Sequence, residues 1–249
     1  MILILGSSRD DTLFFEASLS HPEKEMLFDR YPFVHGRLFN QEIGLVSEVY
    51  TEPEASALTL YLMHRYFVLL VFSIGTCFSY TDDLEVSKVA VSEQVAFGDV
   101  DQSPLKPVNV GQIPGYPAFF RTPKEVMGFL LPCLEARLPN QYEEATFIST
   151  NAFLTKKEEL DPYLVEGKLF GLEKKVVLDC TSAGIAMSCE LTHTPFVSLK
   201  VIEAHVGEKI DYLRYNDILK TYTELGKVIL SALSAISSDE ILQEGGDQV

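Results

Sequence analysis

Short, almost continuously apolar runs of strand length recur along this chain and alternate with segments of helical spacing. Clear examples are residues 2–5, 67–74 and 196–202. A strand covered on both faces loses the alternation of polar and apolar residues that a half-exposed strand shows. The pattern therefore predicts an α/β protein with a central mixed sheet flanked by helices.

The same patterns predict the other strands and helices of the chain. Strands are expected at 2–5, 43–46, 67–74, 86–92, 146–149, 176–178 and 196–202, and helices after Thr51, with Pro53 in the first turn, and over 124–138, 182–191 and 215–236. Residues 100–117 are rich in Pro and Gly and are expected to form a long loop. A chain of 249 residues can form one domain of this class. We expect that domain over 1–237 and an acidic C-terminal tail over 238–249.

Composition and spacing exclude several classes of function. The formal net charge of −16 repels nucleic acid and anionic membrane surfaces. The longest apolar run is too short to span a bilayer, and the four cysteines have no paired spacing, which favours a reducing, cytoplasmic location. The histidines lack ligand spacing and the common nucleotide-binding and zinc motifs are missing, so we expect no metal and no cofactor.

Small and polar residues follow five of the predicted strands. These segments are 6–11, 75–79, 149–154, 179–184 and 200–205. Each alone is typical of an ordinary turn. Open α/β sheets bind ligands beyond the carboxyl ends of their strands, so together the segments predict one ligand-binding rim.

Three local motifs carry a family resemblance. They are the stretch Gly111–Phe120 (GQIPGYPAFF), the pair Ala152-Phe153, and Thr194–Val197 at the entry to the last strand. In order and approximate spacing the chain resembles the nucleoside phosphorylase superfamily from about residue 1 to 237. Within that superfamily it is similar to the methylthioadenosine/S-adenosylhomocysteine nucleosidases.

The resemblance implies a pocket for an adenine nucleoside. Phe153 would stack on the purine, and the backbone of Leu154 would hydrogen-bond the base. An ordinary place in the core remains the alternative for Phe153. Thr76 and Cys77 lie at the expected site, and Thr76 either holds a ribose oxygen or only closes a turn. The resemblance also implies a homodimer in which the Pro-Gly loop contributes across the interface.

The signature E-M-E of the family, whose second Glu holds the ribose hydroxyls, corresponds here to Asp179-Cys180-Thr181. Thr181 would be a weaker, neutral partner for the ribose. Asp179 and Cys180 remain expected substrate-binding residues.

The resemblance assigns three catalytic candidates. Asp11 matches the carboxylate that activates water, and Lys200 replaces the Arg beside that water without its bidentate fork. The Asp that protonates the purine falls at Ala204, so Glu203 is the remaining candidate acid; it either turns into the pocket, where burial raises its pKa, or faces outward. The phosphate-binding Arg of the phosphorylases falls at Ser73, which favours hydrolysis.

Two functions from different classes follow. The first is a purine nucleosidase that hydrolyses the N-glycosidic bond of a 5′-modified adenosine, such as methylthioadenosine, S-adenosylhomocysteine or aminodeoxyfutalosine, with Asp11 as base and Glu203 as acid. The second is a catalytically impaired relative that binds a purine or nucleoside. A phosphorylase with an unfamiliar phosphate site is a third and weaker alternative.

Overall fold

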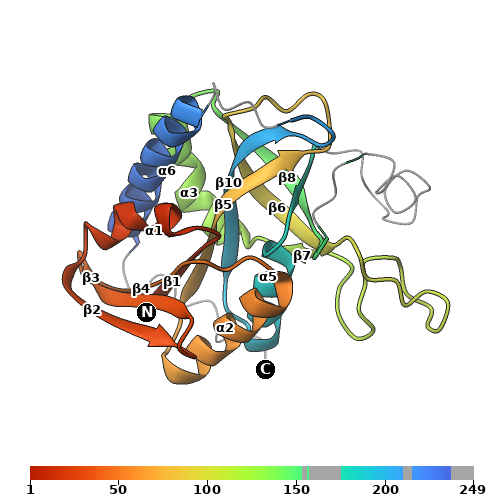
Figure 1. Ribbon diagram of the computed structural model, residues 1–249, viewed down its shortest axis with the longest axis horizontal. Coiled ribbons are helices and arrows are strands. Elements are labelled where there is room, and N and C mark those ends of the chain that lie inside the picture. The colour runs from red at the N-terminus through yellow and green to blue at the C-terminus, as the bar shows by residue number, and fades with distance from the viewer. Residues whose placement is uncertain (153–155, 157–174, 210–214, 237–249) are drawn as a thin grey trace.

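A computed structural model describes residues 1–152, 156, 175–209 and 215–236 of the chain. Its core is one mixed sheet with helices on both faces, which confirms the predicted α/β fold (Figure 1). Phe153, Leu154 and the predicted acidic tail lie outside the described residues.

The sheet combines a closed ring of strands with an open extension. The strands are β1 (Ile2–Gly6), β2 (Ser20–Leu27), β3 (Tyr31–Leu38), β4 (Gln41–Val46), β5 (Leu70–Ser79), β6 (Val89–Phe97), β7 (Phe120–Arg121), β8 (Tyr142–Ser149), β9 (Val176–Asp179) and β10 (Phe196–His205). Pairing runs from β5 through β10, β6, β8 and β9 and back to β5, which closes the ring. On the other side of β5, strands β1, β4, β3 and β2 follow in order.

Two groups of helices cover the sheet. The described helices are α1 (Arg9–Glu16), α2 (Glu52–Arg65), α3 (Lys124–Arg137), α5 (Ser182–Thr192) and α6 (Tyr215–Ala235). Helix α2 begins where sequence predicts, because the hydroxyl of Thr51 accepts a bond from the amide of Glu54 at 3.4 Å and Pro53 occupies the first turn. Helices α1, α3 and α6 lie on one side of the sheet and α2 and α5 on the other (Figure 1).

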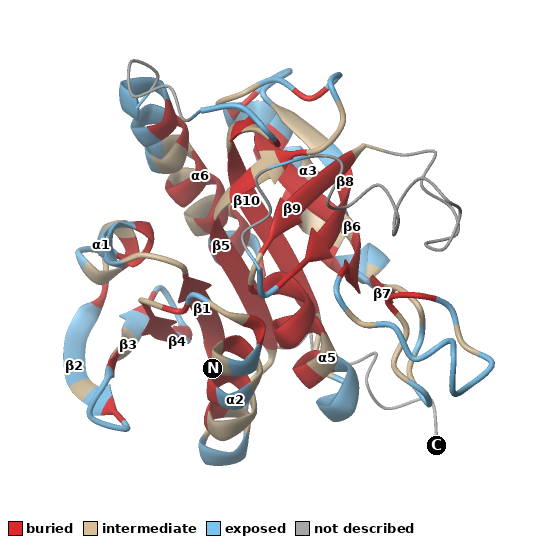
Figure 2. Ribbon diagram, turned by 45° about the vertical axis from the view of Figure 1, so that its right-hand side comes forward, coloured by how far each residue is buried: buried red, intermediate tan, exposed pale blue. Residues whose placement is uncertain are grey.

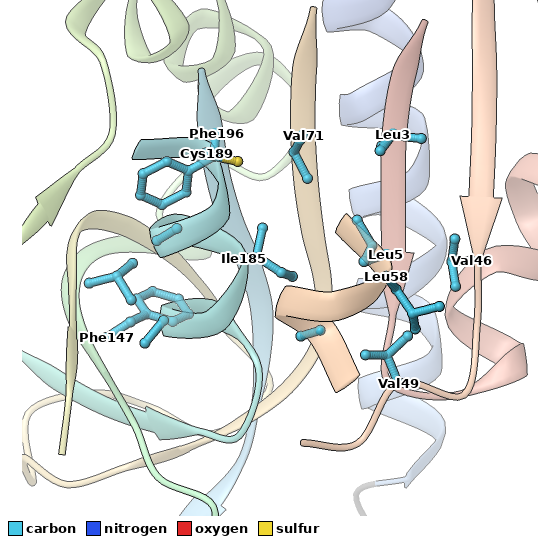
Figure 3. Packing of buried hydrophobic residues seen from close by; sticks show 14 of the residues in the cluster. Leu3, Leu5, Val46, Val49, Leu58, Val71, Phe147, Ile185, Cys189 and Phe196 are labelled. Carbon is cyan, nitrogen blue, oxygen red and sulfur yellow. The ribbon is translucent and has the colours of Figure 1, made fainter. Parts of the chain in front are cut away.

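Strand β1 shows why the apolar runs are continuous. Ile2 and Ile4 point to the core under α1, α3 and α6. Leu3 and Leu5 point to the opposite core, where Leu58 of α2 and other buried side chains of α2 and α5 pack (Figure 3). Burial of both faces removes the polar alternation and leaves the central strands almost wholly buried (Figure 2).

The predictions were wrong about several strands. Strands β2, β3 and β7 were missed, and β6 lies over Val89–Phe97 rather than 86–92. Strand β2 has the sequence SHPEKEML, is mostly exposed and forms the edge of the sheet, where charged residues are usual and apolar alternation is absent. Strands β5 and β10 continue to Ser79 and His205 because they pair with each other to that point, so both predicted strand ends came too early.

The helices of the described ranges include none that is both long and apolar enough to cross a membrane.

Candidate active site

Two adjoining cavities open at the rim that the strand ends form. The larger, about 520 Å³, lies between α1 and α6 and reaches Asp11 and Glu203. The smaller, about 230 Å³, is lined by side chains of β5 and β10 and by the chain at the ends of β8 and β9. Ser7 and Thr76 line both cavities, so the two spaces meet between the end of β1 and the second half of β5. Their sizes suit a small-molecule ligand.

Asp11 enters the larger cavity from the first turn of α1. The chain turns there at Gly6, where an added Cβ would stand 2.8 Å from the Cβ of Asp11. The amide of Ser8 donates to Asp11 Oδ2 at 2.7 Å. Burial raises the pKa of Asp11, while the bonds from Ser8 and the charge of Lys200 act in the opposite direction. A carboxyl group with a raised pKa beside a cavity is suited to exchange protons.

Glu203 reaches the same cavity because β10 is irregular there. Ile202 pairs with Cys77 and Ala204 pairs with Phe78, so Glu203 is an extra residue in the ladder between β10 and β5. Such a bulge redirects a side chain out of the regular alternation. Glu203 lines the cavity together with Asp11. Of the two orientations of Glu203 that the sequence left open, this is the inward one.

Lys200 is fixed by a buried ion pair on the smaller cavity. Its ammonium lies 2.6 Å from Asp179 Oδ2 and donates to Thr181 Oγ1 at 2.7 Å. The side chains of Lys200 and Asp179 are each 1% exposed. A lysine held in this way presents its charge to the cavity in one fixed place.

Asp179 receives further bonds from the segment around it. The hydroxyl of Ser149 donates to Asp179 Oδ1, and the amide of Ser182 donates to Oδ2 at 3.1 Å. Burial opposes the charge of Asp179, but the attraction of Lys200 and the bonds from Lys200, Ser149 and Ser182 outweigh it and lower the pKa. Asp179 is therefore an anion at neutral pH and orients Lys200.

The structure brings together most of the site residues that sequence predicts. Thr76, Asp179, Cys180, Thr181 and Lys200 line the smaller cavity.

The side chain of Cys77 does not join this group. It is buried, faces the carbonyl of Lys200 at 4.0 Å and lines neither cavity. It points into the core because residues alternate along β5, which continues through this position, whereas sequence placed a turn here.

Sequence reasoning missed a buried carboxyl behind the smaller cavity. Glu52, at the start of α2, is 5% exposed; Asn151 Nδ2 donates to its Oε2 at 3.1 Å, and its Oε1 has no hydrogen-bond partner among the described residues. Burial, with the charges of Asp99 and Asp179 adding to it, raises the pKa of Glu52 to about 8. In sequence, Glu52 looks like an ordinary acidic residue in the first turn of a helix, so no local signal marks it.

Free positive charge is scarce around the cavities. Among the described residues that line them, Lys200 is the one cation, and Asp179 neutralises it. Ser73 is buried in β5 and lines neither cavity. The described part of the site thus offers little to hold a phosphate ion.

Comparisons with known proteins agree with this architecture. A family model described as the phosphorylase superfamily matches residues 1–237. A 5'-methylthioadenosine/S-adenosylhomocysteine nucleosidase of Lysinibacillus sphaericus is 22% identical over 236 residues, 94% of this chain and 99% of the relative.

Solved structures show the same fold. The nucleosidase of that name from Colwellia psychrerythraea, in complex with adenine, has a TM-score of 0.80 at 20% identity and covers 94% of each chain. Futalosine hydrolase of Helicobacter pylori has a TM-score of 0.82 at 20% identity, over 94% of this chain and 97% of its own.

Proposed function

Because the chain belongs to the phosphorylase superfamily, we propose that it is a purine nucleosidase that hydrolyses the N-glycosidic bond of a 5′-modified adenosine and releases adenine. The observation that carries the proposal is the pair of carboxyl groups, Asp11 and Glu203, on one cavity that adjoins the Lys200–Thr181 cavity. Cleavage of a ribosyl C–N bond needs a base for the attacking water and an acid for the leaving purine.

Asp11 is the proposed base. Its carboxylate is held by the amide of Ser8 at 2.7 Å and lies near Ser7, which lines both cavities. Because burial raises its pKa, the ionised form binds a proton more readily than an exposed aspartate does. This favours removal of a proton from water as the oxocarbenium-like ribosyl group forms.

Glu203 is the proposed acid. Ala204, which stands at the usual acid position of the resembling family, carries no titratable group. The bulge in β10 instead turns Glu203 toward the cavity. When protonated, Glu203 supplies the proton that the departing purine nitrogen needs.

The smaller cavity is the proposed place of the base, and the ribose is proposed to lie where the two cavities meet at Ser7 and Thr76, with its C–N bond toward Asp11 and Glu203 of the larger cavity. Thr76 and Thr181 present hydroxyl groups to the smaller cavity, and Lys200 adds a fixed positive charge. Asp179 and Cys180 complete the wall, and Phe153 and Leu154, which follow Ala152 of that wall, are the proposed base-binding residues. The larger cavity, with apolar side chains of α6, would take the 5′ substituent.

Hydrolysis is favoured over phosphorolysis. Ser73 stands where the resemblance places the phosphate-binding Arg, and the single described cation on the cavity walls is paired with Asp179. An anion such as phosphate needs an uncompensated charge or several donors. Water is therefore the proposed nucleophile.

A purine-binding protein without turnover is the second candidate. The observation that favours it is Ala204 at the usual acid position. In that case the smaller cavity would still bind adenine through the same walls.

We also propose a cytoplasmic homodimer of this one-domain chain, with residues 1–237 forming the domain. The tip of the 100–117 loop exposes Leu105 to 80%, and Tyr50, 55% exposed, lines the mouth of the smaller cavity. Both are suited to contact a second copy. Sedimentation or light scattering measures the mass in solution, and a monomer at all concentrations contradicts this part of the proposal.

The test is release of adenine. We expect the protein to liberate adenine without added phosphate from at least one of methylthioadenosine, S-adenosylhomocysteine and aminodeoxyfutalosine, as measured by chromatography. Asp11→Asn should lower turnover by about 10³-fold, since it removes the base while keeping the size of the side chain. Asp83→Asn, the same change at an exposed aspartate that lines neither cavity, is the matched control and should lower turnover far less.

Three outcomes separate the alternatives. Adenine binding without release from any substrate favours the binding protein. Release that requires phosphate and yields ribose 1-phosphate favours a phosphorylase. Equal turnover by Asp11→Asn and the parent removes Asp11 as the base.

A further inference from the structure

A tyrosine hydroxyl is buried near Asp11 and makes no hydrogen bond of normal geometry with any other described residue. Tyr222 of α6 lines the larger cavity together with Asp11. Its hydroxyl oxygen is inaccessible to solvent and has no hydrogen bond of normal geometry among the described residues. A buried hydroxyl without a partner costs free energy, so its retention on a cavity wall calls for a reason.

The packing of α6 against α1 fixes where this hydroxyl lies. Gly226, one turn beyond Tyr222, lies so close to α1 that an added Cβ would stand 2.5 Å from Phe14 Cδ1. Thr221 donates to the carbonyl of Ser87 at 2.9 Å, which holds α6 from the other side. With α6 fixed in this way, Tyr222 lines the same cavity as Asp11 of α1.

The two groups influence each other electrostatically. Burial raises the pKa of Tyr222 well above its usual value, and the Asp11 carboxylate raises it further. In return, the hydroxyl of Tyr222 favours the charged form of Asp11 and works against the effect of burial on its pKa. These effects are expected of a donor that stands near a carboxylate.

We propose that Tyr222 is a positioning residue, whose hydroxyl donates to the Asp11 carboxylate, or to a water on it, and holds the carboxylate toward the nucleophile. The inference rests on the proposed function of Asp11 as the base. It adds a fixed point from α6 to the hold that Ser8 has on the carboxylate from α1. A carboxylate held at two points keeps one orientation toward the attacking water.

Other charged and titratable groups face Asp11 and Tyr222 and must be kept constant in any test. Asp10 comes from α1, Cys77 from β5, and Lys200 and Glu203 from β10. None of them is altered by a substitution at Tyr222, so a change in the titration of Asp11 is assigned to the hydroxyl.

The test compares Tyr222→Phe with Tyr142→Phe. Tyr142 lies on β8 away from both cavities, and its hydroxyl bonds Glu135 at 3.3 Å. For Tyr222→Phe we expect kcat to fall about tenfold with little change in KM. The acid limb of the pH profile should move to higher pH, because the charged form of Asp11 loses a donor. Tyr142→Phe should leave both unchanged.

A titration that does not depend on turnover separates this inference from the proposed function. The carboxyl ¹³C resonance of Asp11, assigned with Asp11→Asn, should titrate at higher pH in Tyr222→Phe than in the parent. If the parent releases no adenine yet this shift is found, the contact stands and the nucleosidase assignment fails. An unchanged titration and an unchanged acid limb overturn the proposal.

A second measurement leaves Tyr222 in place. Ultraviolet difference spectra follow ionisation of tyrosines, and Asp11→Asn should lower the pH at which the most alkaline tyrosine ionises, because the neighbouring negative charge is gone. No change between parent and Asp11→Asn contradicts the contact even if Tyr222→Phe does not fold.

Discussion

Asp179 and Asp11 are buried to nearly the same degree, 6% and 7% exposed, yet burial has opposite outcomes at the two sites. At Asp179 the ammonium of Lys200 at 2.6 Å and two serine donors lower the pKa. At Asp11 the amide of Ser8 and the more distant Lys200 do not offset burial, and the pKa is raised. Where an ion pair and hydrogen bonds fully offset the cost of burial, the carboxylate stays charged and orients its neighbours. Where they offset that cost only in part, the carboxyl group can exchange protons.

The largest effect is expected when the cation that pairs with Asp179 is removed. Lys200→Met leaves a buried carboxylate without its cation and should lower the free energy of unfolding by about 3–5 kcal/mol. Adenine release should be lost as well. Urea unfolding measures the first and chromatography the second.

The matched control is Lys220→Met, which removes an exposed ion pair with Asp217. It should change the free energy of unfolding by less than about 1 kcal/mol. The double variant Lys200→Met/Asp179→Leu should recover much of the stability, because no unpaired charge remains. If Lys200→Met is as stable as the control, Asp179 is not held by Lys200 and the contrast between the two carboxylates fails.

A smaller effect, on turnover rather than folding, is expected at Glu203. Glu203→Gln keeps the size of the side chain but cannot donate the proton, so turnover should fall by about 10²-fold with little change in KM. Glu208→Gln, the same change at an exposed position after β10, should have no effect. A Glu203→Gln variant as fast as the parent rules out Glu203 as the acid, and the chemical role of this cavity would then rest on Asp11 alone.

The parts of the molecule that sequence predicts are those set by local pattern. The covered strands, the start of α2 at Thr51 and the rim of strand ends follow from apolar periodicity, capping and turn chemistry. The hairpin of β2 and β3 was not predicted because its edge strand is polar and exposed.

The features of the site that were not predicted from the sequence depend on contacts between distant segments. The orientation of Glu203 depends on a bulge against β5, which only the register of two distant strands creates. Glu52 reaches the site through the packing of α2, and nothing in its neighbouring residues indicates burial. Tyr222 falls on the apolar stripe of α6, but only the packing of α6 against α1 brings it to the same cavity as Asp11. Such long-range contacts leave no local pattern in the sequence.

Glu52 is a third buried carboxyl group to compare with Asp179 and Asp11, and its substitution is expected to have the smallest effect. Its pKa is raised to about 8 by burial, with Asp99 and Asp179 adding to it. In the unfolded chain it ionises near its ordinary pKa of 4.5. Between these values the folded chain holds a proton that the unfolded chain has lost, so this group makes stability fall as pH rises from about 5 to about 8.

Glu52→Gln removes that dependence and keeps an acceptor for Asn151. The variant should therefore gain free energy of unfolding over the parent as pH rises from 5 to 8, by at least about 1 kcal/mol at the upper end. Urea unfolding at several pH values measures the difference, and Glu144→Gln, an exposed position, should show none. A difference that stays constant with pH would mean that Glu52 is ionised in the folded chain. Glu52 would then be a third anion beside Asp99 and Asp179.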